Sequence, residues 1–205
     1  ILPLGPTGYG DSPYQSFSTF AGNPYFIDLE SLIEKKWLTG QDCREADFGT
    51  DEAYVDYEKM YRARFRLLRK AYDNSRIASD PDFQLFTEDY ALYMAIKDSL
   101  KGASYLTWEE GLKLRRKEAL DAARAALSEE IACYQFQQYL FTTQWRALKS
   151  YANSKGILIV GDIPIYVAPD GADTWAHPEL FQLEEDRTAL GQPPVPLGIP
   201  QADRI

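Results

Sequence analysis

Two short apolar runs lie far apart in the chain and constrain its fold more than any other feature. The first, Ile1 to Leu4, is too short for a helix and ends at Gly5-Pro6, which is typical of a buried strand followed by a loop. The second, Ile157 to Val167, is rich in β-branched residues and directly follows a helical stretch. Because a helix that leads into a buried strand is the unit of a parallel α/β fold, we expect an α/β protein.

The interval between the two runs is long and mostly helical. It holds about 150 residues, whereas a crossover between parallel strands needs only about a dozen. Apolar periodicity and capping residues predict helices from Asp28 to near Gly40, from Glu52 to Asp73, from Asp80-Pro81 toward Gly102, from a Thr107/Glu110 capping box onward, and from Ser128 to Ser154 with a stop at Gly156. We therefore expect an inserted helical subdomain between two strands.

The charge balance excludes some classes of partner. The chain of 205 residues carries 22 Lys and Arg against 31 Asp and Glu, a net charge of -9. This charge repels phosphate backbones and anionic membrane surfaces, and no stretch approaches the ~20 apolar residues of a membrane span. We expect neither nucleic acid nor membrane as a partner. Cys43 and Cys133 lack metal-ligand spacing and a disulfide-rich pattern, which favours a reducing, cytoplasmic location.

The loop from Gly5 to Gln15 is the first candidate for a binding site. Its three glycines and two prolines favour an irregular surface loop that can aim side chains. Tyrosine, aspartate, serine and glutamine side chains on such a loop suit a polyhydroxylated ligand. A purely structural turn explains the composition equally well. Phosphate binding is disfavoured, since neither a Gly-Lys-Ser/Thr motif nor a dinucleotide fingerprint follows.

Asp162 and His177 are further candidates for chemistry. Asp162 lies where the second predicted strand runs toward its C-terminal edge, and ligand sites of barrels and open α/β sheets gather at that edge. The alternative is an acid that caps or salt-bridges within the scaffold. His177, the sole histidine, precedes Pro178-Glu179, which favours the start of a short helix. A metal site and a nucleophilic triad both lack support.

Several blocks of the chain resemble the amylomaltases, the 4-alpha-glucanotransferases of glycoside hydrolase family 77. The longest is ILPLGPTGYGDSPYQSFSTFAGNPYFIDLE, from Ile1 to Glu30. DYALYMAIK, from Asp89 to Lys97, is similar to the helical insertion of that family, and Gln137 to Gly156 resembles the helix before its third strand. GDIPIYVAPDGADTWAHPELFQL, from Gly161 to Leu183, resembles that strand and the loop after it. The resemblance extends to about Glu185.

The resemblance implies a fold and a division of the chain. The fold of the family is a (β/α)8 TIM barrel with helical insertions, so this chain is expected to be a barrel fragment with strands 2 and 3 and a large, mostly helical insertion between them. Residues 1–22 would form strand 2 and the substrate loop, 23–126 the helical insertion, and 127–185 a barrel helix, strand 3 and its following loop. Residues 186–205 form a divergent, proline-rich tail.

The resemblance also implies sugar contacts. Carried over position by position, it makes Tyr9, Asp11, Ser12 and Tyr14 candidate glucan ligands and places Asp162 on the active-site face. Tyr57 resembles a tyrosine of an outer glucan site. The implied partners are maltooligosaccharides and α-1,4-glucans, without a metal or other cofactor.

The implied activity is the retaining transfer of α-1,4-glucan segments, in which one carboxylate attacks the anomeric carbon and an acid protonates the leaving glucan. In the family those carboxylates lie on later strands, so none of the acids present here receives a catalytic role and the fragment is expected to be inactive by itself. A non-catalytic glucan-binding module is the alternative. A third reading, a nucleotide-binding α/β domain, lacks its motif.

The two ends suggest a partial chain. Ile1 is not an initiator Met, and the resemblance implies that the chain lacks the first barrel strand and the C-terminal catalytic half of the family. After Glu185 the resemblance gives way to a stretch with four prolines between Gly191 and Pro200. This abrupt change motivates the hypothesis of a truncated or frame-shifted product.

Overall fold

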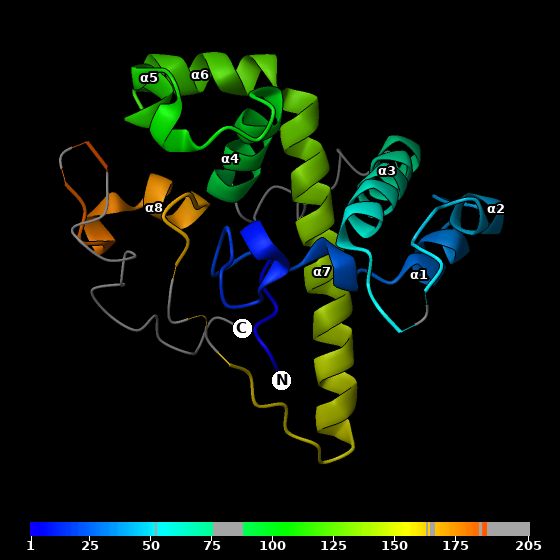
Figure 1. Ribbon diagram of the computed structural model, residues 1–205. Coiled ribbons are helices and arrows are strands. Elements are labelled where there is room, and N and C mark those ends of the chain that lie inside the picture. The colour runs from blue at the N-terminus through cyan, green and yellow to red at the C-terminus, as the bar shows by residue number, and fades with distance from the viewer. Residues whose placement is uncertain (52, 76–87, 163, 165–166, 185, 188–205) are drawn as a thin grey trace. The chain divides into compact units, whose positions relative to one another are not determined.

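The computed structural model describes residues 1–51, 53–75, 88–162, 164, 167–184 and 186–187 (Figure 1). The chain divides into two compact units. The first unit comprises Ile1–Ala21, Asp89–Ile131 and Gly161–Ile205, and the second comprises Gly22–Glu88 and Ala132–Val160. Each unit is therefore built from segments that are distant in sequence.

The two predicted strands are not formed in the part of the chain that the structure describes. Ile1 to Leu4 and Ile157 to Val160 carry no strand assignment. Their apolar side chains are largely exposed, with 61% of Leu2, 83% of Leu158 and 77% of Val160 accessible. A strand of a parallel sheet exists only through hydrogen bonds to neighbouring strands, and no such neighbours are formed among these residues. The prediction of strands 2 and 3 is therefore not confirmed.

The first unit is a set of short helices joined by loops. Its elements are η1 (Tyr9–Asp11), α4 (Glu88–Ser99, apart from its first residue), η5 (Tyr105–Thr107), α5 (Glu110–Lys113), α6 (Lys117–Ala126), α8 (Ala172–Ala176) and η6 (Pro178–Leu180). Four buried aromatic rings form its centre: Tyr93 of α4, Tyr105, Trp108 and Trp175 of α8. Their ring centroids lie between 5.4 and 6.4 Å apart, which is the range of favourable edge and tilted contacts.

Two predicted helix ends in this unit had opposite outcomes. Gly102 has φ +79° and its amide donates to the carbonyl of Lys97 at 2.8 Å, so it ends α4 as predicted. The start at Thr107 is wrong, because Thr107 closes η5 and its hydroxyl donates to the carbonyl of Ser104. Glu109 caps α5 instead, accepting from the amide of Gly111. The predicted start of the helix that ends at Gly102, at Asp80-Pro81, lies outside the described residues, which resume at Glu88.

The second unit holds η2 (Pro24–Phe26), α1 (Leu29–Glu34), α2 (Gly40–Arg44), α3 (Tyr57–Ser75) and most of α7 (Ser128–Ser154). Its core joins α1, α3 and α7 through Leu32, Leu67, Leu68, Phe136 and Leu140, all almost inaccessible. The bounds of α7 match the sequence prediction, and Gly156 at φ +75° ends the helix.

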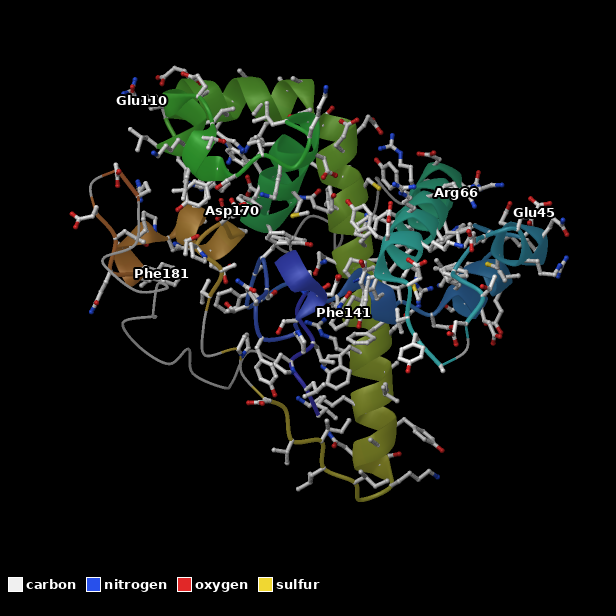
Figure 2. All side chains as sticks on the ribbon, in the orientation of Figure 1. Glu45, Arg66, Glu110, Phe141, Asp170 and Phe181 are labelled. Carbon is white, nitrogen blue, oxygen red and sulfur yellow. The ribbon has the colours of Figure 1, made fainter. Side chains whose placement is uncertain are left out.

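Gly22 and α7 meet closely within the second unit. The side-chain amide of Gln138 accepts from the Gly22 amide at 2.7 Å and donates to its carbonyl at 3.0 Å. A Cβ on Gly22 would lie 1.9 Å from a ring carbon of Phe141, a residue labelled in Figure 2. Only glycine fits this position without displacing the helix side chain.

The predicted helix from Asp28 is shorter than expected. Asp28 caps α1 by accepting from the amides of Glu30 and Ser31, as predicted. The helix ends before Lys36, which takes the left-handed conformation at φ +61°. Gly40 is not its stop but the first residue of α2, because Thr39 and Asp42 form a capping box there.

Candidate functional site

The opening loop, Gly5–Gln15, closes on itself. The Gly8 amide donates to the carbonyl of Gln15 at 3.0 Å, and Thr7 forms an antiparallel bridge with Ser16. Between these points η1 turns the backbone, with Gly10 at φ +78° and Asp11 at φ +52°. The two limbs of the loop are thus tied together, so its tip is held in a defined direction.

Two of the predicted site residues meet beside this loop, close to where its limbs are tied together. The Tyr14 hydroxyl donates a hydrogen bond of 2.9 Å to Oδ2 of Asp162, 148 positions away in the chain. Both side chains are exposed. The bond to the Asp162 carboxylate raises the pKa of Tyr14 above its ordinary value of 10.0, with smaller contributions from desolvation and from the negative charge itself. The pair therefore presents a protonated phenol and a carboxylate side by side to solvent.

Three other predicted site residues lie in the same loop, and one lies in the second unit. Asp11 accepts a hydrogen bond of 3.4 Å from the Thr7 hydroxyl, and Ser12 Oγ accepts from the Tyr14 amide at 3.3 Å. Both contacts are local and shape the loop. Tyr9 is the first residue of η1, and its side chain lies outside the described part. Tyr57 is the first residue of α3 in the second unit and is 43% exposed.

Asp173 at the start of α8 holds the segment that follows the loop. Its Oδ1 accepts from the Ser18 hydroxyl at 2.9 Å, and its Oδ2 accepts from the Thr19 amide and the Thr19 hydroxyl, each at 2.7 Å. The Asp173 side chain is buried, with 9% of the residue exposed. Such bonds to an ionised acceptor are about twice as strong as neutral ones.

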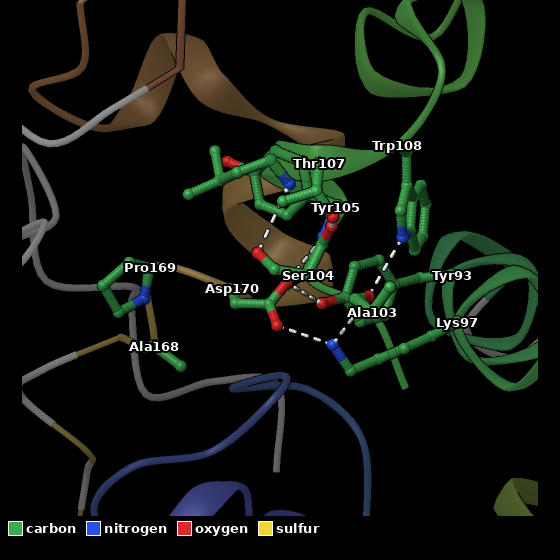
Figure 3. A network of polar contacts seen from close by, with 12 residues as sticks. Tyr93, Lys97, Ala103, Ser104, Tyr105, Thr107, Trp108, Ala168, Pro169 and Asp170 are labelled. Carbon is green, nitrogen blue, oxygen red and sulfur yellow. Dashed lines mark hydrogen bonds and ion pairs between the residues drawn. The ribbon is translucent and has the colours of Figure 1, made fainter. Parts of the chain in front are cut away.

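A second acid of the same segment, Asp170, organises a buried polar network (Figure 3). Its Oδ1 accepts from the Tyr93 hydroxyl and the Tyr105 amide, each at 2.9 Å, and its Oδ2 lies 2.5 Å from the Lys97 ammonium. Lys97 also donates to the Ala103 carbonyl at 3.3 Å. The side chains of Lys97 and Asp170 are only 5% and 13% exposed. The network joins α4, the η5 turn and the segment before α8.

A cation on an aromatic ring adds to this packing. The Arg115 guanidinium lies 4.3 Å from the ring centroid of Trp175 and forms an ion pair of 2.5 Å with Asp89 at the start of α4. Trp175 in turn donates from its indole nitrogen to the Leu112 carbonyl at 2.9 Å. Arg115 has φ +58°, an unusual conformation for a residue with a side chain.

Asp170 and Asp173 were not among the site residues predicted from the sequence. A signal was present, because Asp170-Gly171-Ala172-Asp173 combines a turn dipeptide with an acid at the start of a helix. That pattern predicts capping within one element. The partners found in the structure lie more than sixty positions away, and no local pattern encodes them.

Two cavities of the described residues lie away from the predicted site residues. One of about 260 Å³ in the second unit is lined by Asp47, Lys59, Arg62, Ala63 and Arg66. Another of about 350 Å³ in the first unit lies among Leu114, Pro178, Glu179, Leu183, Glu184 and Arg187. Within the described ranges no three His, Cys, Asp or Glu side chains are grouped so as to hold a metal ion. Likewise, none of the helices in those ranges is long and apolar enough to cross a membrane.

An exposed phenol, a carboxylate and hydroxyl groups on a tied loop can donate to and accept from the hydroxyls of a sugar. Residues 1–198 match the family model described as 4-alpha-glucanotransferase of glycoside hydrolase family 77. The chain belongs to this family, which confirms the resemblance seen in the sequence. The resemblance was expected to end near Glu185, but the match to the family model continues to residue 198.

The individual relatives agree with this assignment. The chain is 45% identical to a 4-alpha-glucanotransferase of Clostridium butyricum over 91% of its own length, and 44% identical to one of Thermus thermophilus over 98%. It also matches the structure of an amylomaltase from Streptococcus agalactiae in complex with acarbose, with a TM-score of 0.84 and 40% identity over 91% of this chain. In each case it spans 40% of the length of the matched protein.

Proposed function

We propose that this chain supplies part of the glucan-binding groove of a 4-alpha-glucanotransferase, which transfers α-1,4-glucan segments between maltooligosaccharides by a retaining mechanism. The observation that carries this proposal is the contact of Tyr14, in the opening loop, with Asp162. Family membership supports it, as does the related amylomaltase solved with acarbose, a maltooligosaccharide-like ligand.

The chemistry of the pair suits a sugar. The face of a tyrosine ring packs on the C–H surface of a pyranose, while a carboxylate accepts hydrogen bonds from its hydroxyl groups. Because Tyr14 holds Asp162 by a hydrogen bond, a sugar meets a carboxylate whose orientation is already set, which lowers the entropic cost of binding.

The other parts of the proposal come from the family. Asp11, Ser12 and Tyr9 would contact glucan from the same loop, and Tyr57 would contribute to an outer glucan site. We also propose a barrel fragment in which residues 1–22 and 127–185 supply strands 2 and 3 and residues 23–126 form the helical insertion. The protein would act in the cytoplasm without a metal or other cofactor. The catalytic carboxylates would lie outside these 205 residues.

Titration of the chain with maltotriose and maltoheptaose tests the glucan site, with binding followed by calorimetry. We expect Asp162→Asn and Tyr14→Phe each to weaken binding by about tenfold or more, as loss of a charged or buried hydrogen bond does. Tyr151→Phe is the matched control. It also removes a tyrosine hydroxyl, but from a residue of α7 that is 64% exposed and not part of the proposed site. Equal binding by all three variants would refute the assignment.

Turnover is a separate test. The chain is expected not to convert maltotriose into glucose and longer maltooligosaccharides, since it is assigned no catalytic carboxylate. Release of glucose by the purified chain would show that the catalytic groups lie within it.

A further inference from the structure

The segment that follows the opening loop is anchored at one acid. Both oxygens of Asp173 accept hydrogen bonds from Ser18 and Thr19, at 2.7 to 2.9 Å. Ser18 is 2% exposed and Asp173 is 9% exposed, so water does not compete freely for these bonds. A buried carboxylate without such donors would be strongly destabilising, which means that Asp173 and the two residues hold each other in place.

The start of α8 adds a second contact at the same point. The Ala172 amide donates to the Phe17 carbonyl at 2.7 Å. A Cβ on Gly171 would lie 3.1 Å from that carbonyl oxygen and 3.0 Å from the carbonyl oxygen of Ala168. The helix start and the loop segment are therefore packed backbone against backbone, and Phe17 to Thr19 cannot shift without moving α8.

The anchored segment is linked to the limbs of the opening loop by short hydrogen bonds. The Ser16 hydroxyl lies 2.7 Å from the Pro6 carbonyl oxygen and 2.6 Å from that of Ser18, and it accepts from the Ser18 amide at 3.2 Å. Ser16 thus connects both limbs of the loop to the anchored segment. Since the limbs are also joined at Gly8 and Gln15, a continuous path of hydrogen bonds runs from Ser18 to the part of the loop that carries Tyr14.

We propose that Asp173 is a positioning residue: by holding Ser18 and Thr19 it aims Tyr14 at Asp162 and so sets the affinity of the glucan site. This role rests on the function proposed above. Asp173 does not touch the glucan, because its oxygens are buried and occupied by donors of the chain itself.

The first test measures the pKa of Tyr14, which depends on its contact with Asp162, in the absence of any ligand. In protein labelled with 13Cζ-tyrosine, with the Tyr14 signal assigned from Tyr14→Phe, the pKa of Tyr14 is followed by NMR. In Asp173→Ala we expect it to fall toward its ordinary value of 10.0, because the bond to Asp162 is lost. Asp121→Ala, which removes an exposed carboxylate of α6 in the same unit, should leave it unchanged. An unchanged Tyr14 pKa in folded Asp173→Ala would overturn the proposal.

Milder variants separate positioning from loss of charge and from loss of folding. Ser18→Ala and Thr19→Val each remove a hydroxyl donor to Asp173 and leave the net charge intact. We expect the double variant to lower the Tyr14 pKa in the same direction and to weaken maltoheptaose binding about tenfold, with an unchanged amide spectrum in the aromatic centre around Trp175. A double variant with parental Tyr14 pKa and affinity would refute positioning, even if Asp173→Ala does not fold.

The two proposals fail in different ways. If the parent chain binds no maltoheptaose but the Tyr14 pKa responds to the Asp173 partners, the glucan site is wrong and the positioning role stands. If glucan binds through Tyr14 and Asp162 but neither readout responds to Ser18 and Thr19, the positioning role is wrong.

Discussion

Removal of the Asp170 carboxylate is expected to be the most damaging single change in the first unit. In Asp170→Ala the Lys97 ammonium, 5% exposed, loses an ion-pair partner at 2.5 Å, and the Tyr93 hydroxyl and Tyr105 amide lose their acceptor. Breaking a buried ion pair from one side costs about 3–5 kcal/mol. Each donor left unsatisfied adds up to about 1–3 kcal/mol, although water that enters the space reduces that cost. We expect a total near the upper end of the ion-pair range.

The assay is urea unfolding followed by tryptophan fluorescence. Trp108 and Trp175 are 5% and 1% exposed in the centre beside the network, so their emission reports the loss of this packing. The midpoint should fall at an unchanged slope, because the surface exposed on unfolding is the same. Asp121→Ala is the control: Asp121 pairs with Lys117 on the surface of α6, and an exposed pair contributes only about 0.2–1 kcal/mol.

A second variant isolates the cause. If the buried charge of Lys97 without Asp170 is the main cost, Lys97→Met in the Asp170→Ala background removes this charge and restores part of the stability, since a buried pair can be replaced by apolar groups at little net cost. A loss in Asp170→Ala no larger than in Asp121→Ala would refute the reasoning, as would a double variant that is less stable than Asp170→Ala.

Three further predictions concern the second unit. Gly22→Ala should lower the free energy of unfolding by about 1–3 kcal/mol or more in urea titrations, since its Cβ would lie 1.9 Å from the Phe141 ring; an unchanged midpoint would contradict the packing. The hydrogen bond from Lys70 holds the pKa of Asp42 at about 2 against an ordinary 3.8, so the stability it contributes is present above about pH 4 and is lost as the pH falls toward 2. Thermal transitions of the parent and Asp42→Asn should therefore converge over that interval, and a constant difference down to about pH 2 would count against the pair. Burial raises the pKa of the Cys133 thiol, so a disulfide reagent at about pH 8 should label it only as fast as the protein unfolds, whereas immediate labelling would place it at the surface.

The helices show what local sequence can predict. The stripe of apolar residues along Ser128–Ser154 and the glycine after it give the bounds of α7, because a 3.6-residue period and a left-handed stop are properties of the segment itself. Asp28 as the cap of α1 and Gly102 as the end of α4 follow from the same kind of signal. The start predicted at Thr107 and the stop predicted near Gly40 were wrong, because Glu109 caps α5 and Thr39 caps α2.

The two predicted strands depend on more than local sequence. Ile1–Leu4 and Ile157–Val160 have the composition of strands, but no strand is formed there within the described ranges. β-propensity measures how well a residue fits a pleated, half-buried surface, and that surface is made by neighbouring strands rather than by the segment. The exposed side chains of Leu158 and Val160 show that this surface is absent from around them.

Some features of the candidate site also follow from local sequence, while others depend on the tertiary structure. From the sequence alone, Gly5–Gln15 is a constrained polar loop, Asp162 is an acid after an apolar run, and the family follows from the blocks that resemble it. Only the tertiary structure joins Tyr14 to Asp162 across 148 positions, and only it gives Asp170 and Asp173 their partners. A hydrogen bond depends on the distance between two groups in space, and for groups so far apart along the chain the packing of the whole unit decides that distance.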